Sequence, residues 1–177
     1  HFRARRDRAT KLLLYLGVEG ALPELEHHTL LFTREWELGF DAIFGADPAV
    51  PDPASLYLCK PSGVDPDVAP EGYENLFVLV PIPADPTIGR GDVDGDGDTR
   101  IEVLADTVIA QIAEWTGIPD LASRVTLRRT VGPGNFAEEL HACSLYHGIG
   151  RFNGTDQTFG FDHAECIKGN FRHEKST

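Results

Sequence analysis

The sequence predicts an α+β fold in which a mixed, mainly antiparallel sheet is flanked by helices. Segments of strand length and segments of helical periodicity follow one another without the regular strand–helix–strand alternation that is typical of parallel sheets. The chain has 177 residues, of which 41% are apolar and 25% are charged. This size and composition are those of one globular domain with a packed core.

Two long apolar segments predict the central strands. Residues 11–18 (KLLLYLGV) form a short apolar run that glycines and a proline close, which favours a buried strand. Residues 76–82 (LFVLVPI) are apolar at nearly every position, which is typical of a strand that is covered on both faces. Pro81 and Pro83 indicate that this strand ends at an edge or exit of the sheet, because proline lacks the N–H of a ladder hydrogen bond.

Three shorter segments complete the predicted sheet. Residues 27–33 (HHTLLFT) and 55–60 (SLYLCK) have the length and composition of strands. Residues 124–131 predict a half-buried strand, because apolar and polar side chains alternate along them. The apolar set is Val125, Leu127 and Val131, and the polar set is Thr126, Arg128 and Thr130.

Helical spacing predicts two further elements. Residues 35–44 carry apolar side chains at i, i+4, i+7 and i+8, which form one face of a helix. These side chains are Trp36, Phe40, Ile43 and Phe44. Residues 133–140 are expected to open a short helix. Residues 47–53, 61–72 and 86–98 are rich in Pro, Gly and Asp and therefore predict loops.

The helix that begins at Thr99 has the strongest pattern. Thr99 and Glu102 have the spacing of a capping box, in which the hydroxyl and the carboxylate satisfy free N–H groups. Gly117 is placed to end the helix in the left-handed conformation, and Pro119 follows it. The predicted apolar stripe consists of Ile101, Leu104, Val108, Ile112 and Trp115.

The charge and cysteine content exclude several classes of protein. A formal net charge of -12 disfavours binding to nucleic acid and to anionic lipid, but leaves apolar docking on a membrane open. Three cysteines, Cys59, Cys143 and Cys166, are too few for a disulfide framework, so a reducing, cytoplasmic setting is expected. No apolar run approaches the roughly 20 residues that a membrane span needs.

Two groups of residues have the chemistry of metal ligands. Residues 92–98 (DVDGDGD) resemble the start of a calcium loop, because hard oxygens stand at alternate positions. The twelfth position, which should bring a bidentate glutamate, is Val103, so a solvated acidic turn is favoured. A second group, near the C-terminus, consists of histidines and cysteines, which are residue types that bind zinc. Because these residues do not form paired C-x-x-C units, the favoured interpretation is that they bind no metal. This group is His141, Cys143, His147, His163 and Cys166.

The adjacent His27 and His28 stand at the start of a predicted strand. Adjacent side chains of a strand point to opposite faces, so these two are not expected to share one ligand role. We therefore nominate no metal ligand from the sequence.

Several spaced segments together resemble the phytoene desaturase branch of the flavin-dependent amine oxidase-like superfamily. They are LLLYLGV at 12–18, HHTLLFTREWELGFDAIF at 27–44, DPASLYLCKPSGVDPDVAPEGYENLFVLVPIP at 52–83 and GPGNFAEEL at 132–140. The resemblance covers residues 11–141. Members of this family begin with a strand–GxGxxG–helix unit that seats the flavin pyrophosphate, and end with a Gly-rich segment that closes over the flavin. Neither unit is found in this sequence.

The resemblance implies an internal piece of a carotenoid desaturase. Residues 11–142 are expected to be a segment of the substrate-binding domain, 1–10 are unmatched, and 143–177 are a divergent tail. The parent enzyme is expected to be an FAD-dependent oxidoreductase that passes a hydride from a carotenoid precursor such as phytoene to the flavin. No cofactor-binding residue is nominated here, and the isolated chain is expected to be inactive.

The expected partner is a long isoprenoid hydrocarbon, bound at a membrane surface on the cytoplasmic side. Phe32, Trp36 and Phe40 are the candidate substrate-binding residues, and an apolar concavity is expected over the strand at 76–82. No acid–base pair or catalytic residue is nominated. Two other interpretations stay open at this point: a non-catalytic isoprenoid- or lipid-binding module, and a domain with a structural calcium or zinc site.

Overall fold

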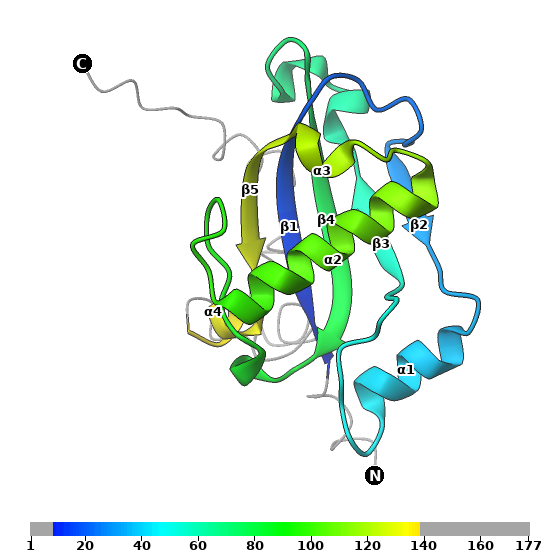
Figure 1. Cartoon of the computed structure of the whole chain (residues 1–177), viewed down its shortest axis with the longest axis vertical. Helices are drawn as coiled ribbons and strands as arrows, with labels where there is room; N and C mark the ends of the chain where they lie inside the picture. Colours follow the sequence, from blue (N-terminus) through cyan, green and yellow to red (C-terminus); the bar gives the residue numbers. More distant parts are fainter. Residues whose placement is uncertain (1–8, 139–177) are drawn as a thin grey trace, which may run out of the picture.

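The computed structural model describes residues 9–138, and its centre is a five-stranded sheet (Figure 1). The strand order is β2-β3-β4-β1-β5, and every neighbouring pair is antiparallel. The strands are β1 Ala9–Glu19, β2 His28–Leu31, β3 Leu56–Cys59, β4 Tyr73–Pro83 and β5 Val125–Val131. The α+β class with a mainly antiparallel sheet is confirmed.

Helices pack around this sheet or connect its strands. The α-helices are α1 Trp36–Phe44, α2 Thr99–Thr116, α3 Leu121–Arg124 and α4 Pro133–Glu138. Short 3₁₀ turns occur within the predicted loops, at η2 Pro61–Gly63, η3 Pro66–Val68 and η4 Pro86–Ile88. The sequence did not predict α3, because one helical turn has no measurable periodicity.

The two long apolar segments form the central pair of strands. β1 and β4 are paired from Ala9–Pro83 to Glu19–Tyr73 without interruption. β3 pairs with β4 only from Phe77 to Leu79, so Pro81 and Pro83 lie beyond the last residue that β3 contacts in the ladder. The prediction that the prolines mark the exit of the strand is therefore confirmed, since their missing N–H groups affect no β3 pairing.

The main core lies between the sheet and α2, which crosses one face of the sheet diagonally (Figure 1). Alternate residues of β1, β3 and β4 point into this core, as the period of two requires. The sheet contributes Leu12, Leu14, Leu16, Val18, Leu56, Leu58, Leu76, Val78, Val80 and Ile82. The helix contributes Ile101, Ala105, Val108, Ile109 and Ile112. Leu104 is only partly buried and Trp115 is half-buried, so the observed stripe is shifted slightly from the predicted one.

The two ends of α2 differ in how well the sequence predicted them. Gly117 has φ 75°, and its N–H donates to the carbonyl of Ala113, so the left-handed termination is confirmed. The capping box is wrong, because Asp98 is the N-cap residue and Thr99 is already helical. Glu102 is buried and turns toward β5 instead of toward the end of the helix.

The strand β5 also departs from its predicted pattern. Thr130, predicted to lie on the polar side, is almost fully buried at 1% exposure. Thr130 is directly opposite Leu14 of β1, whose side chain points into the main core, so Thr130 lies on the same buried face of the sheet. The polar Thr130 is tolerated in the interior because its hydroxyl donates to Glu102, at 2.6 Å.

The second face of the sheet carries a smaller cluster of aromatic and aliphatic side chains. Its buried members are Leu13, Cys59, Phe77 and Phe136, and Tyr15, Tyr57, Leu79 and Val131 pack against them. Both faces of β4 therefore contribute to a cluster of buried side chains, as the uninterrupted apolar run predicts.

Candidate functional site

An exposed apolar surface lies where β2 leads into α1. It consists of Leu30, Phe32, Trp36, Leu38 and Phe40, each of which is more than half exposed. Five large apolar side chains are thus exposed within eleven residues of the chain. The surface contains all three candidate substrate-binding residues.

The helix α1 positions two of these candidates. Trp36 and Phe40 are one turn apart and therefore lie on one side of α1. The ring of Phe40 packs against that of Phe44 at 4.4 Å between centroids. Ile43 is buried and anchors the helix to the body of the protein, so α1 turns only part of its apolar side inward.

Phe32 borders a groove of about 630 Å³ next to α1. Its apolar lining residues are Phe32, Leu38, Ala42, Val50, Pro51, Pro53 and Trp115, and its polar and charged ones are Thr33, Arg34, Glu35 and Asp52. Trp36 and Phe40 do not line it. The concavity expected over residues 76–82 does not correspond to this groove, which none of those residues lines.

A buried amide fixes the loop wall of the groove. The side chain of Gln111 on α2 accepts from the backbone N–H of Ala54 at 3.1 Å and donates to the carbonyl of Ala54 at 2.6 Å. Both backbone groups are thereby satisfied away from water. Gln111 could not be identified from the sequence, because its partner lies 57 residues away and one polar residue in a helix has no distinctive pattern.

The aromatic rings on the second sheet face lie in mutual contact. The ring of Phe77 is 5.3 Å from that of Tyr15 and 6.3 Å from that of Tyr57. Next to them, the ammonium of Lys11 lies 5.1 Å above the ring of Phe136, and burial lowers the pKa of Lys11. The sequence indicated that this strand face is apolar, but the gathering of aromatic rings from three strands depends on the strand order.

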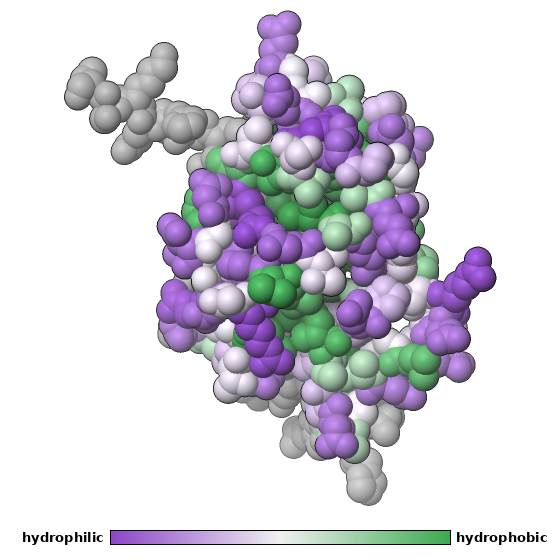
Figure 2. All heavy atoms as spheres, viewed as in Figure 1, coloured by the Kyte–Doolittle hydropathy of each residue, from purple (hydrophilic) through white to green (hydrophobic). Residues whose placement is uncertain are grey.

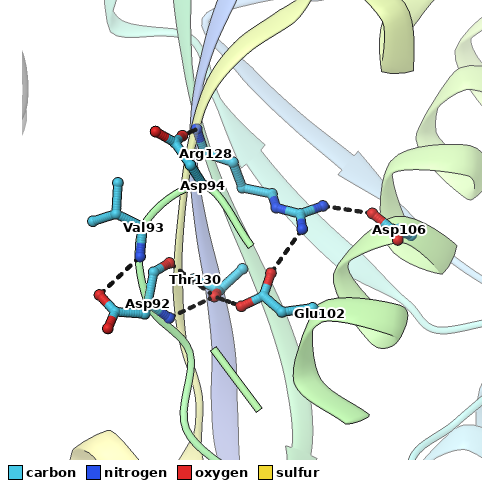
Figure 3. A network of polar contacts seen from close by, with 7 residues as sticks. All are labelled: Asp92, Val93, Asp94, Glu102, Asp106, Arg128 and Thr130. Carbon is cyan, nitrogen blue, oxygen red and sulfur yellow. Dashed lines mark hydrogen bonds and ion pairs between the residues drawn. The ribbon is translucent and has the colours of Figure 1, made fainter. Parts of the chain in front are cut away.

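The acidic loop uses its carboxylates to hold the backbone (Figure 3). Asp94 accepts from the backbone N–H of Arg128 at 3.1 Å, and Asp92 accepts from that of Val93 at 2.8 Å. Asp98 accepts from the backbone N–H of Arg90 at 2.7 Å. These carboxylates diverge toward separate N–H donors, which supports the interpretation of a turn over that of a calcium loop.

Behind the loop, an ion pair joins α2 to β5 (Figure 3). Glu102 lies 2.8 Å from the guanidinium of Arg128, which also lies 2.5 Å from Asp106. The other oxygen of Glu102 accepts from Thr130. Asp106 is exposed, whereas Glu102 is buried. The arrangement is a structural link, because both acidic partners are held by one cation and neither faces the groove.

His27 and His28 lie close to Cys59, so the expectation that these two side chains point to opposite faces is wrong. One ligand atom of each of the three residues lies within 4.8 Å of the other two. The prediction failed because only His28 belongs to β2; His27 lies in the bend before it, where strand alternation does not apply. The predicted C-terminal cluster, from His141 to Cys166, lies outside the described residues.

The structure is that of an α+β domain with several large apolar side chains exposed around α1. Among residues 9–138, no helix combines the length and the apolar character of a transmembrane span. No family model matches the chain.

The chain is, however, similar to curated proteins over most of its length. It is 42% identical over 130 residues to a carotenoid 3,4-desaturase of Haloarcula japonica, a match that covers 73% of this chain and 24% of that protein. It is 33% identical over 145 residues to a lycopene-forming phytoene desaturase of Paracoccus, covering 82% of this chain and 27% of that protein. It is 35% identical over 126 residues to a zeta-carotene-forming phytoene desaturase of Myxococcus xanthus, a match that covers 71% of this chain and 23% of that protein.

The chain belongs to the carotenoid desaturase family. It spans about a quarter of the length of the curated relatives that it matches. The family resemblance predicted from the spaced segments is thereby confirmed.

Proposed function

We propose that this chain supplies the apolar, substrate-binding side of an FAD-dependent oxidoreductase that desaturates a carotenoid precursor such as phytoene. The observation that carries the proposal is the exposed apolar surface around α1, on a chain with a net charge of -12. Relatives of the chain are named carotenoid and phytoene desaturases, which act as oxidoreductases. A long isoprenoid hydrocarbon is the partner that such a surface suits.

A hydrocarbon offers no polar group, so it can be held only by apolar contact. Phe32, Trp36 and Phe40 are 68%, 61% and 54% exposed. Complete burial of one such side chain contributes about 1.5–3 kcal/mol, so covering the exposed part of all three would contribute about 4 kcal/mol. Figure 2 shows hydrophobic side chains reaching the surface near α1 among predominantly hydrophilic ones.

The N-termini of the two longest described helices do not suit the pyrophosphate of FAD. A helix N-terminus attracts phosphate through its free N–H groups and dipole. The two longest described helices, however, begin beside carboxylates: Glu35 and Glu37 at α1, and Asp98 and Glu102 at α2. The flavin, which would accept the hydride from the substrate, is therefore expected to be held by other parts of the enzyme.

An exchange of segments tests the proposed role in catalysis. The 130 matched residues of the Haloarcula desaturase are replaced by those of this chain, and the carotenoid product is measured by its absorption spectrum. The hybrid is expected to form product. Adding Trp36→Asp should lower kcat/KM at least about tenfold, because a carboxylate would be placed against a hydrocarbon.

Val64 provides the matched control. It is as exposed as Phe32, at 69%, but lies after η2, away from α1. Val64→Asp in the same hybrid should leave the rate within about twofold, since surface changes outside a contact site have small effects. Equal losses for Trp36→Asp and Val64→Asp, or a hybrid that folds and binds FAD but forms no product, would contradict the proposal.

Because its hydrocarbon substrate dissolves in lipid, we also propose that the enzyme works at the cytoplasmic surface of a membrane. The net charge of -12 disfavours attraction to anionic headgroups, so the contact would depend on apolar side chains.

A further inference from the structure

We propose that His27, His28 and Cys59 form a binding site for a borderline-soft divalent metal ion of the zinc type. Two imidazole nitrogens and one thiol sulfur lie within 4.8 Å of one another. Zinc binds nitrogen at about 2.0–2.1 Å and sulfur at about 2.3 Å, so its tetrahedral ligands stand roughly 3.3–3.7 Å apart. Small side-chain rotations at the edge of the sheet would close the remaining distance.

The sheet register brings His28 and Cys59 together. They are directly opposite in the antiparallel ladder between β2 and β3, so their side chains project from the same face. β2 is an edge strand in the sheet order, which leaves His28 exposed, whereas Cys59 is 3% exposed. The site thus has a buried thiol at its base and an open side through which an ion and a water ligand can enter.

A hydrogen bond turns His27 toward the same pair. The carbonyl of His27 accepts from the backbone N–H of Lys60 at 2.8 Å, which continues the pairing one residue beyond β2. Nδ1 of His27 lies 2.9 Å from the carbonyl of Lys60 and must donate to it, since a carbonyl only accepts. The proton is therefore on Nδ1, and Nε2 keeps the lone pair that a metal requires. The rings of His27 and His28 are 4.0 Å apart.

Tyr57 orients the ring of His28. Its phenol oxygen lies 2.8 Å from Nδ1 of His28. Nδ1–H of His28 can donate to the phenol oxygen. This hydrogen bond leaves Nε2 of His28 free for an ion, as outer hydrogen bonds do in metal sites.

Ligand chemistry selects the kind of ion. A thiolate with two imidazoles suits zinc or copper, whereas calcium and magnesium require oxygen ligands. A thiol must lose its proton to bind the ion. Formation of the metal–sulfur bond breaks the S–H bond and releases one proton to solvent, so affinity should increase with pH. A bound ion would clamp the edge strand β2 to β3.

Cobalt(II) tests the site in the full chain, because a thiolate bound to Co²⁺ gives an intense charge-transfer absorption. Two other cysteines could also bind, so the experiment uses the variant Cys143→Ser/Cys166→Ser beside the unchanged chain. The expected result is one thiolate-bound Co²⁺ per chain in both proteins, displaced by Zn²⁺. Loss of the band in the double variant would show that the metal binds the C-terminal cysteines, and would overturn the proposal.

Substitutions at the site complete the test. Cys59→Ser should abolish the charge-transfer band, and His28→Ala, at an exposed position, should weaken Co²⁺ binding more than about 100-fold. Tyr57→Phe should keep the band but weaken binding about 10–100-fold, which a merely structural role would not produce. Circular dichroism establishes that each variant is folded. A band that survives Cys59→Ser, or affinity that His28→Ala leaves unchanged, would refute the site.

Discussion

Replacing Glu102 by glutamine tests the link between α2 and β5. The substitution keeps the shape of the side chain and an oxygen that can accept from Thr130, but it removes the charge that faces Arg128. Glu102 is 7% exposed, and the side chain of Arg128 is 17% exposed, so the pair is largely shielded from water. The expected result is a lower free energy of unfolding.

The structure sets the size of this loss. Removing one partner of a buried ion pair typically costs about 3–5 kcal/mol, because the other charge is left unpaired. Here Arg128 keeps a second partner in Asp106, whose side chain is 66% exposed and whose attraction is therefore screened. Oε2 of Glu102 lies within ion-pair distance of the Arg128 guanidinium but has no hydrogen-bond partner of its own. We expect Glu102→Gln to lower the free energy of unfolding by about 2–3 kcal/mol.

Urea denaturation followed by circular dichroism measures the effect, with equal m-values as the condition for comparison. Asp106→Asn is the matched control, and should cost less than about 1 kcal/mol because its partner is at the surface. The double variant Glu102→Leu/Arg128→Met should recover much of the loss, since apolar residues can replace a buried pair. A loss below about 0.5 kcal/mol for Glu102→Gln, or an equal loss for both single variants, would refute this reasoning.

Two further predictions concern the groove wall and an exposed cap. Gln111→Met should lower the free energy of unfolding by about 2–3 kcal/mol, because both buried backbone groups of Ala54 lose their partner. For the same reason, amide hydrogen exchange at Ala54 should become faster. Unchanged exchange at Ala54 would contradict the role assigned to Gln111. Hydrogen bonds from the side-chain hydroxyl and the backbone N–H of Thr87 lower the pKa of Asp85. The ionised Asp85 therefore stabilises the folded protein at pH values above its unfolded-state pKa. This stabilisation is lost as the pH falls through the lower folded-state pKa. The difference in thermal stability between the unchanged chain and Asp85→Ala should therefore disappear at acid pH, and a difference that persists there would exclude this cause.

The apolar patterns predicted most of the elements correctly. The segments at 11–18 and 76–82 became β1 and β4, and the helix was found from its stripe and from Gly117. These predictions succeeded because period and terminal residues are local properties that a short segment carries by itself. The capping box at Thr99 failed because Glu102 has a stronger partner in Arg128, which is 26 residues farther along the chain.

Some residues of the candidate sites could be nominated from the sequence, whereas others were found only in the structure. The side chains of Phe32, Trp36 and Phe40 could be nominated from the sequence, and in the structure each of them is more than half exposed. Their contact with a hydrocarbon stays a prediction. The approach of His27 and His28 to Cys59 could not be found, since it depends on the pairing of two strands and on a bend before one of them.

The sequence by itself determined the α+β class, the family, the two central strands and the position of the main helix, because each follows from nearby residues or from similarity along the chain. Only the tertiary structure decided the strand order, the groove beside α1 and the cluster of His27, His28 and Cys59. The physical reason is that local propensity sets which face of an element is apolar, whereas long-range packing selects the partner that covers it.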